Sequence, residues 1–226
     1  MERGRELRPK VLKLLRSKNL EFCLRELLKL PLKKVINTLI SLFYINDQEI
    51  RWRSITAIGM AVSYLAEKDM ESARIIMRRF MWSLNDESGG IGWGVPEAMG
   101  EVMACNENLA KEYSHILVSY LCKDCNFLEF ELLQCGVIWG IGRLAQVRPY
   151  LVKNAVFYLL PYLESDNAVL RGLSVWTLGF LGDDHICLKL ESLFNDKDEV
   201  ELYIDRKLKN YCIGDLARKT VAIIKN

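Results

Sequence analysis

Residues 165–182 read SDNAVLRGLSVWTLGFLG, and three segments upstream repeat the second half of this pattern. Each segment begins with an apolar residue and reaches a glycine nine positions later. The four glycines are spaced by 41, 42 and 37 residues, which is the period of a two-helix repeat. The four segments are IRWRSITAIG (50–59), IGWGVPEAMG (91–100), LQCGVIWGIG (133–142) and LRGLSVWTLG (170–179).

A further helical run precedes each segment, so every repeat is expected to contain a first and a second helix. Asp47, Asp86 and Asp166 lie 12 to 14 residues before their glycines, close to the start of each second helix. Side-chain oxygens at such positions accept hydrogen bonds from the free N–H groups of a helix start. The first helices are expected at 32–44, 68–84, 108–122 and 149–163.

Composition indicates a folded protein that needs neither disulfides nor a metal. The 226 residues are 50% hydrophobic, and no apolar run approaches the roughly 18 residues that cross a bilayer. Charges occur every two or three positions over the first thirty residues, which does not fit a signal peptide. The sequence therefore predicts a cytoplasmic location with no membrane insertion.

The segment 165–182 resembles a HEAT-like repeat of the kind first noted in phycobilisome bilin lyases. Arg51 and Arg171 match the arginine of that pattern, whereas Gly92 and Gln134 depart from it. The runs RRFMWSLNDESGGIGWGVPEAMGE and LQCGVIWGIGRLAQVRP, which begin at residues 78 and 133, are similar to a family of uncharacterised HEAT-repeat proteins from anaerobic prokaryotes. That family brings no assigned activity to this chain.

The resemblance implies an all-α fold, a right-handed α-α superhelix of about four to five helix pairs. We expect a single HEAT-like domain over 1–226, with a basic helical cap at 1–31, four repeats over 32–182 and a C-terminal cap at 183–226. Within that last cap, EVELYIDRKLKNYCI (199–213) alternates apolar and polar residues around Asp205-Arg206, which predicts a small β-hairpin. DLARKTVAIIKN is expected to form the closing helix.

A helical wheel places two sets of side chains on opposite faces of each second helix. The aliphatic residues nine before and one before each glycine share the core face. The positions seven residues before, three residues before and one residue after each repeat glycine lie on the opposite face of the helix. These positions include four of the five tryptophans. In a right-handed stack these positions line the concave surface, which predicts a binding groove. The groove residues are Trp52, Trp93, Glu97, Glu101, Trp139, Arg143 and Trp176.

The competing interpretation is that the indoles are sandwiched between neighbouring second helices and extend the core. Gly136, Gly140 and Gly172 would permit that close approach. Similarly, Glu97 and Glu101 form a carboxylate pair that is able to take a divalent cation, or a pair that is solvated or satisfied by Arg143. Arg51 and Arg171 are expected to be structural ties to aspartates such as Asp47 and Asp166.

A glycine-rich turn before Pro96 departs most from the repeat. It has three interpretations: an anion or nucleotide site, to which Arg78 and Arg79 contribute; a loop that contacts a peptide or ligand; and a structural turn between repeats. It lacks the lysine of a phosphate-binding loop. Its candidate residues are Asp86, Glu87, Ser88, Gly89, Gly90 and Gly92.

The cysteines and histidines complete no motif for metal binding or catalysis. Cys122 and Cys125 form an isolated CxxC, and the two histidines, His115 and His185, complete no metal-binding pattern. The sequence therefore predicts no metal site and no cofactor, and it assigns no catalytic residue. Residues 1–34 carry 11 Lys and Arg against 4 Glu, whereas the remaining chain is net acidic.

These observations favour a non-catalytic scaffold that binds a protein or peptide through its concave face. The first alternative is a lyase-like enzyme, or a binder of a small molecule or chromophore, with a pocket at the glycine-rich turn 88–94. Nucleic-acid binding ranks last, because the chain beyond residue 34 is net acidic.

Overall fold

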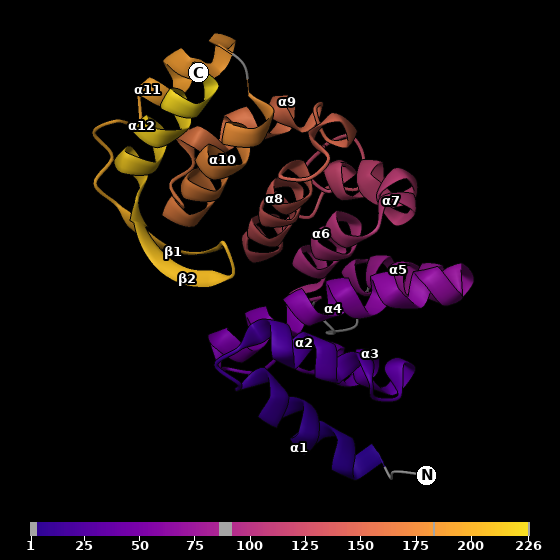
Figure 1. Ribbon diagram of the computed structural model, residues 1–226. Helices are drawn as coiled ribbons and strands as arrows, with labels where there is room; N and C mark the ends of the chain where they lie inside the picture. The colour runs from indigo at the N-terminus through magenta and orange to yellow at the C-terminus, as the bar shows by residue number, and fades with distance from the viewer. Residues whose placement is uncertain (1–3, 86–91, 183, 226) are drawn as a thin grey trace. The chain divides into compact units, whose positions relative to one another are not determined.

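The computed structural model describes residues 4–85, 92–182 and 184–225 (Figure 1). The backbone divides into two compact units, 1–109 and 110–226, and each is described by itself below. Both units are helical, and a two-stranded antiparallel sheet lies near the C-terminus, as the sequence predicts. A single domain over the whole chain stays a prediction.

The first unit begins with the predicted N-terminal cap, whose two helices pack against the helices that follow. The longest helix starts where expected, because the Asp47 carboxylate accepts a 3.1 Å hydrogen bond from the Ile50 N–H. The last helix follows Gly94, whose φ of 72° is left-handed, and has Pro96 in its first turn. The helices are α1 (Gly4–Leu15), α2 (Leu20–Leu28), α3 (Leu32–Ser41), α4 (Gln48–Lys68), α5 (Met70–Leu84) and α6 (Val95–Cys105).

The repeat glycine of α4 marks the place where the next second helix packs. A Cβ atom on Gly59 would lie 2.5 Å from Cγ of Glu101 and 3.1 Å from Sγ of Cys105, both on α6. The Ser63 hydroxyl also donates to the carbonyl oxygen of Cys105 over 3.1 Å. Glycine at this position therefore allows α4 and α6 to approach closely.

The second unit continues the alternation of first and second helices, but its first helices are less regular. The continuous helix expected at 149–163 is wrong: the chain forms short segments, with a break between η1 and α9, and Pro161, which has no N–H to donate, lies where α9 gives way to η2. The elements are α7 (Glu107–Ser119), which starts in the first unit, then α8 (Glu131–Ala145), η1 (Pro149–Leu151), α9 (Ala155–Leu159), η2 (Leu160–Glu164), α10 (Ala168–Leu181), η3 (Asp184–Ile186), α11 (Cys187–Glu191), β1 (Glu199–Ile204), β2 (Lys207–Cys212) and α12 (Ile213–Ile224).

Helices α8, α10 and α12 pack side by side in one layer (Figure 1). A Cβ atom on Gly142 of α8 would lie 2.3 Å from Cζ3 of Trp176 on α10. The Thr177 hydroxyl donates to the carbonyl oxygen of Ile138, and the Thr220 hydroxyl donates in the same way from α12 to α10. At the start of α10, Asn167 rather than the expected Asp166 caps the helix.

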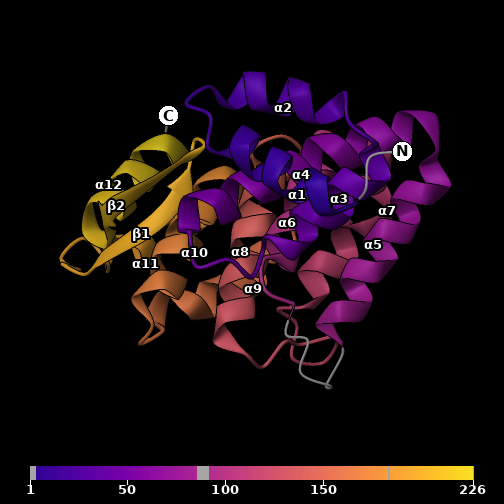
Figure 2. The same cartoon turned by 90° about the horizontal axis from the view of Figure 1, so that it is seen from below.

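The predicted hairpin is confirmed and lies between α11 and α12 in the chain. Glu199 pairs with Cys212 and Ile204 with Lys207, so the turn is Asp205-Arg206. Both turn residues have positive φ, 52° and 63°, as a two-residue hairpin turn of type I′ requires. Strand β1 packs on α10 and β2 on α12 (Figure 2).

The residues expected on the core face of the second helices are buried, but much of the opposite face is buried as well. The aliphatic residues nine before and one before the repeat glycines are buried wherever the structure describes them. Among the described residues, no helix combines the length and apolar character needed to cross a membrane. The buried residues are Ile50, Ile58, Met99, Leu133, Ile141, Leu170 and Leu178.

Candidate functional site

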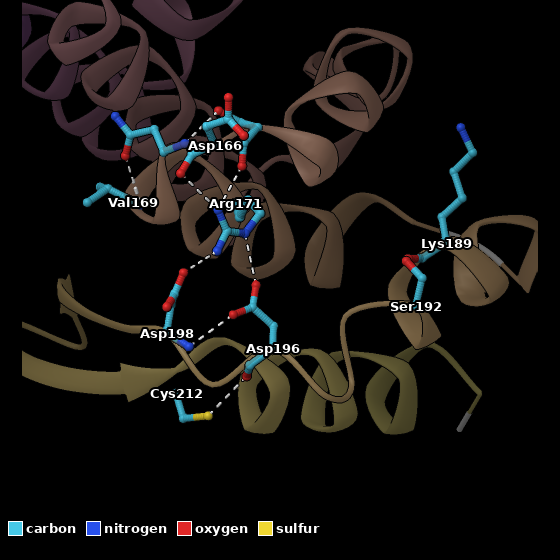
Figure 3. Close-up of polar contacts among 10 residues, drawn as sticks. Asp166, Val169, Arg171, Lys189, Ser192, Asp196, Asp198 and Cys212 are labelled. Carbon is cyan, nitrogen blue, oxygen red and sulfur yellow. Dashed lines mark hydrogen bonds and ion pairs between the residues drawn. The ribbon is translucent and has the colours of Figure 1, made fainter.

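Arg171, near the start of α10, binds the segment of chain that leads into the β1–β2 hairpin. Its Nε donates to Asp196 over 2.8 Å and its Nη2 donates to Asp198 over 2.6 Å. Its Nη1 donates to the carbonyl oxygens of Ser165 and Asp166. Figure 3 shows the guanidinium between Asp166 on one side and the two aspartates on the other. Arg171 is a structural tie, as expected, but Asp166 contributes its backbone and not its carboxylate.

Arg171 and Asp196 form an ion pair, and both side chains have shifted pKa values. The hydrogen bond to Asp196 raises the pKa of Arg171, and burial opposes this shift. Burial acts to raise the pKa of Asp196, but hydrogen bonds from Arg171 and from the Asp198 N–H hold that pKa below its ordinary value. The base of the hairpin is therefore held by groups that remain charged at neutral pH.

The hairpin that Arg171 positions covers the tryptophans of the second unit. Trp139 and Trp176 are only 3% and 6% exposed, so they are not the open row of indoles that the groove interpretation requires. Their rings stack with centroids 6.4 Å apart, and the Tyr203 ring lies 6.2 Å from that of Trp139. The wheel identified the correct face of α8 and α10, but strand β1 occupies it.

Gly172 shows how closely this strand approaches the helix. A Cβ atom there would lie 2.8 Å from Cγ2 of Val200 in β1. Two of the preceding repeats carry Trp52 and Trp93 at this helical position. The change to glycine thus makes room for the hairpin, and not for a neighbouring second helix as the sequence suggested.

A cavity of about 270 Å³ remains beneath the hairpin turn, between the turn and the helices α8 and α10. Its walls combine indole rings with two guanidinium groups, those of Arg143 and Arg206. We call this cavity the hairpin pocket. It is lined by Trp139, Arg143, Gln146, Trp176, Tyr203, Ile204, Asp205 and Arg206.

A second cavity, of about 230 Å³, adjoins the hairpin pocket and shares four of its residues. Phe180, Tyr211 and Ile223 make it more apolar, and Lys219 adds a further cation. The shared residues are Gln146, Trp176, Ile204 and Asp205. The two cavities therefore form a pair of neighbouring recesses along the hairpin.

The groove residues of the first unit are arranged differently. Trp52 is half-buried, and the Arg51 guanidinium carbon lies 5.7 Å from its ring centroid. Glu97 and Glu101 are only 4% and 0% exposed, so the alternative of a solvated carboxylate pair is wrong, and the alternative of a pair satisfied by arginine stays open. Trp93 is also half-buried.

The partner of Glu97 is Arg51, which lies in the preceding repeat. Its Nη2 atom is 3.0 Å from Glu97 Oε1, and the pair is mostly buried. Burial raises the pKa of Glu97, and the charge of Arg51 opposes that shift. Arg51 is a structural tie as expected, but among the described residues its ion-pair partner is Glu97 and not Asp47.

Most of the glycine-rich turn, including Asp86, Glu87, Ser88, Gly89 and Gly90, lies outside the described residues. Gly92 is described and packs tightly, because a Cβ atom there would lie 2.9 Å from Cδ2 of Leu84. The proposed anion contacts are exposed on α5 and engage neighbouring side chains: Arg78 pairs with Glu71, and Arg79 donates to Asn37 over 2.8 Å. An anion site at this turn stays a prediction.

Within the described ranges, no three His, Cys, Asp or Glu side chains converge as metal ligands would. Sequence reasoning missed Asp205 and Arg206 as pocket residues, since it interpreted them only as a turn. It also missed Gln146, which lies one residue beyond the end of α8. Arg143 and Arg206 gave no joint signal, because they lie 63 residues apart in the sequence and the place where the hairpin packs was not predicted.

Comparison with known proteins supports the repeat fold. Residues 133–181 match the model of the HEAT-like repeat. An uncharacterized protein of Archaeoglobus fulgidus is 26% identical over 179 residues, which cover 79% of this chain and 91% of that protein.

Designed repeat proteins are among the similar solved structures. One designed armadillo repeat protein has a TM-score of 0.51, and another, solved in complex with the peptide (KR)4, has a TM-score of 0.53. Both are 15% identical to this chain and cover 96% of it, and the chain covers 99% and 98% of them. The chain thus shares the helical-repeat fold of these proteins and is similar in sequence to HEAT-like repeats.

Proposed function

We propose that the protein is a non-catalytic scaffold that binds a peptide segment of a partner protein at the hairpin pocket. The observation that carries this proposal is the pocket's lining of two stacked indoles beside two arginines. Aromatic and arginine side chains are the types that contribute most to binding at protein interfaces.

The size of the pocket favours a side chain over a whole small molecule. Its volume of about 270 Å³ lies just below the roughly 300–1,000 Å³ that is usual for small-molecule sites. The adjoining recess of about 230 Å³ would take a second side chain of the same segment. This reasoning supports a peptide side chain over a whole small molecule at the hairpin pocket, and it does not bear on the alternative of a pocket at the turn 88–94.

The charges at the pocket indicate an acidic segment. Arg143, Arg206 and Lys219 line the two recesses, against the single carboxylate of Asp205. A guanidinium offers paired donors that suit a carboxylate. The preferred ligand is therefore an extended peptide that places an apolar side chain next to Asp or Glu. A designed armadillo neighbour was solved in complex with the basic peptide (KR)4, which supports a peptide as the kind of ligand but not its acidic charge.

A peptide-binding measurement tests the proposal. Fluorescently labelled acidic-apolar peptides, basic peptides of the (KR)4 type and a single-stranded oligonucleotide are titrated with the full chain. We expect saturable binding of the acidic-apolar set, and we expect Arg143→Glu and Arg206→Glu each to weaken it by at least about tenfold. Lys153→Glu, the same charge change at an exposed residue outside both recesses, serves as the matched control.

Three outcomes would contradict the proposal. Equal binding of the acidic and basic peptides would show that Arg143 and Arg206 do not select an acidic ligand. An identical loss of affinity in Lys153→Glu would assign the effect to net charge. Preference for the oligonucleotide, with affinity that falls steeply as salt is added, would favour the nucleic-acid alternative.

A further inference from the structure

The CxxC segment of the second unit forms a tight turn that brings its two cysteines together. The Cys125 N–H donates a 3.0 Å hydrogen bond to the Cys122 carbonyl oxygen, which closes a four-residue turn. Cα atoms at the ends of such a turn are less than about 7 Å apart, and disulfides span about 4.4–6.8 Å between Cα atoms. The backbone of this turn is therefore compatible with a disulfide between its ends.

Hydrogen bonds on both sides hold the turn in place. The Leu128 N–H donates to the Tyr120 carbonyl oxygen over 3.1 Å, and Asn126 Nδ2 donates to the Ser119 hydroxyl over 3.0 Å. The segment therefore has a defined shape although Cys125 is exposed. A disulfide that closes in a preformed turn loses little further chain freedom.

The two thiols occupy unlike surroundings. Cys122 is buried, whereas Cys125 faces solvent. The pKa of Cys122 lies below its ordinary value, first because the Cys125 thiol hydrogen-bonds to it, with further contributions from the Asp124 N–H and the Tyr158 hydroxyl. The same thiol–thiol hydrogen bond raises the pKa of Cys125.

We propose that Cys122 and Cys125 form a redox-active dithiol, which a small-molecule disulfide converts into a disulfide within the turn. In the first step Cys125 loses its proton to solvent and its thiolate attacks the oxidant, so that a mixed disulfide forms and one oxidant thiolate leaves. In the second step the Cys122 thiolate attacks Sγ of Cys125, and the second oxidant thiolate leaves. The two protein thiols lose two electrons and two protons, and the oxidant is reduced to two thiols.

The surroundings assign one role to each cysteine. Cys125 is the residue that a bulky oxidant reaches, and Cys122 resolves the mixed disulfide from within the fold. Because the first step requires the Cys125 thiolate, its rate should rise about tenfold for each pH unit below the pKa of Cys125. The second step is intramolecular, because the turn holds Cys122 close to Sγ of Cys125.

The test is oxidation of the reduced full-length protein by oxidised glutathione, followed by alkylation of free thiols and peptide mass spectrometry. We expect the wild-type peptide that contains both cysteines to lose two hydrogen atoms and to carry no glutathione. Cys122→Ser should accumulate a stable glutathione adduct on Cys125. Cys125→Ser should leave Cys122 reduced, since the buried thiol is not reached.

Cys105→Ser is the matched control, because it removes another exposed cysteine outside this turn. It should leave the disulfide between Cys122 and Cys125 unchanged. A persistent glutathione adduct on wild-type Cys125 would overturn the proposal. So would a disulfide from either residue to another cysteine, or oxidation of Cys105 while both turn thiols stay free. Circular dichroism of each serine variant verifies that it is folded.

Discussion

The indole N–H of Trp139 donates a 2.7 Å hydrogen bond to the backbone carbonyl oxygen of Tyr203, 64 residues later in the chain. Both residues are buried, and the bond joins the middle of α8 to the end of strand β1. Together with Arg171 at the base of the hairpin, it fixes the hairpin at two points over the second helices. The shape of the hairpin pocket depends on this arrangement.

Replacement of Trp139 by Phe tests that bond. The ring would still fill most of the space, but the Tyr203 carbonyl oxygen would lose its buried donor. We expect the free energy of unfolding to fall by about 1–3 kcal/mol. Urea unfolding followed by circular dichroism measures the change. Phe157→Leu, at a side chain that is 76% exposed, should change stability little, and an equal effect there would contradict the explanation.

Two repeat glycines should respond oppositely to alanine. Gly142→Ala places a methyl group 2.3 Å from Trp176 and 2.6 Å from Thr177 Oγ1, so it should destabilise the protein by about 1–3 kcal/mol. Gly179→Ala meets Thr220 at 3.4 Å, an ordinary contact, and alanine is the better helix former. We expect that variant to be neutral or more stable by up to about 1 kcal/mol. Thermal unfolding of both variants decides the matter, and equal losses would contradict close packing at Gly142.

Arg171→Gln should loosen the hairpin more than Asp198→Asn does. The arginine and Asp196 are both nearly buried, so its removal leaves a carboxylate without its partner, at a cost of about 3 kcal/mol. Asp198 is 62% exposed, and an exposed ion pair contributes only about 0–1 kcal/mol. Hydrogen exchange of the amides of β1 and β2 measures the difference. Similar exchange rates in the two variants would contradict the role of Asp196.

The ion pair between Arg171 and Asp196 predicts that the stability of the hairpin depends on pH in the acidic range. Because the pKa of Asp196 is lowered in the folded state, its contribution is present above its ordinary value of 3.8 and is lost as the pH falls through the folded-state pKa. Wild type should therefore lose hairpin protection as the pH is lowered below 3.8, and Asp196→Asn should lack this component. Exchange rates at a series of acidic pH values, compared between the two proteins, provide the measurement.

Glu97 predicts a pH dependence of the opposite sign. Its folded-state pKa is raised by burial, so its contribution is complete below its ordinary value of 4.5 and decreases as the pH rises through the folded-state pKa. The charge on Arg51 does not change over this range. The difference in unfolding free energy between wild type and Glu97→Gln should therefore decrease as the pH rises above 4.5. A constant difference, measured by urea unfolding, would show that the pKa of Glu97 is the same in the folded and unfolded states.

The repeat and its faces were predictable because they depend on local periodicity. The spacing of Gly59 and Gly142, the burial of Ile58 and Ile141, and the hairpin turn at Asp205 all follow from residues close together in sequence. A wheel reports which side chains share a face of one helix. It carries no information about what later packs on that face.

The parts that failed depend on contacts between distant segments. Glu97 is buried because Arg51, 46 residues earlier, neutralises it, and no spacing rule links the two. Trp139 is covered by Tyr203, 64 residues later, and Gly172 leaves space for Val200 of the same strand, whereas alternation in a strand shows only that one of its sides is apolar. The full set of residues of the hairpin pocket therefore could not be predicted from the sequence, because the position of the hairpin on α8 and α10 was not known.

The hairpin also has a consequence for synthesis of the chain. The ribosome completes α8 and α10 before it reaches β1, which begins 18 residues after the end of α10, so each nascent chain passes through a stage in which the strand that covers Trp139 and Trp176 has not yet been made. A premature stop codon after Asp198 would leave that stage permanent. Such a product would retain every helix through α11 but would expose an aromatic surface that promotes aggregation. It would therefore be a target for chaperones and proteases.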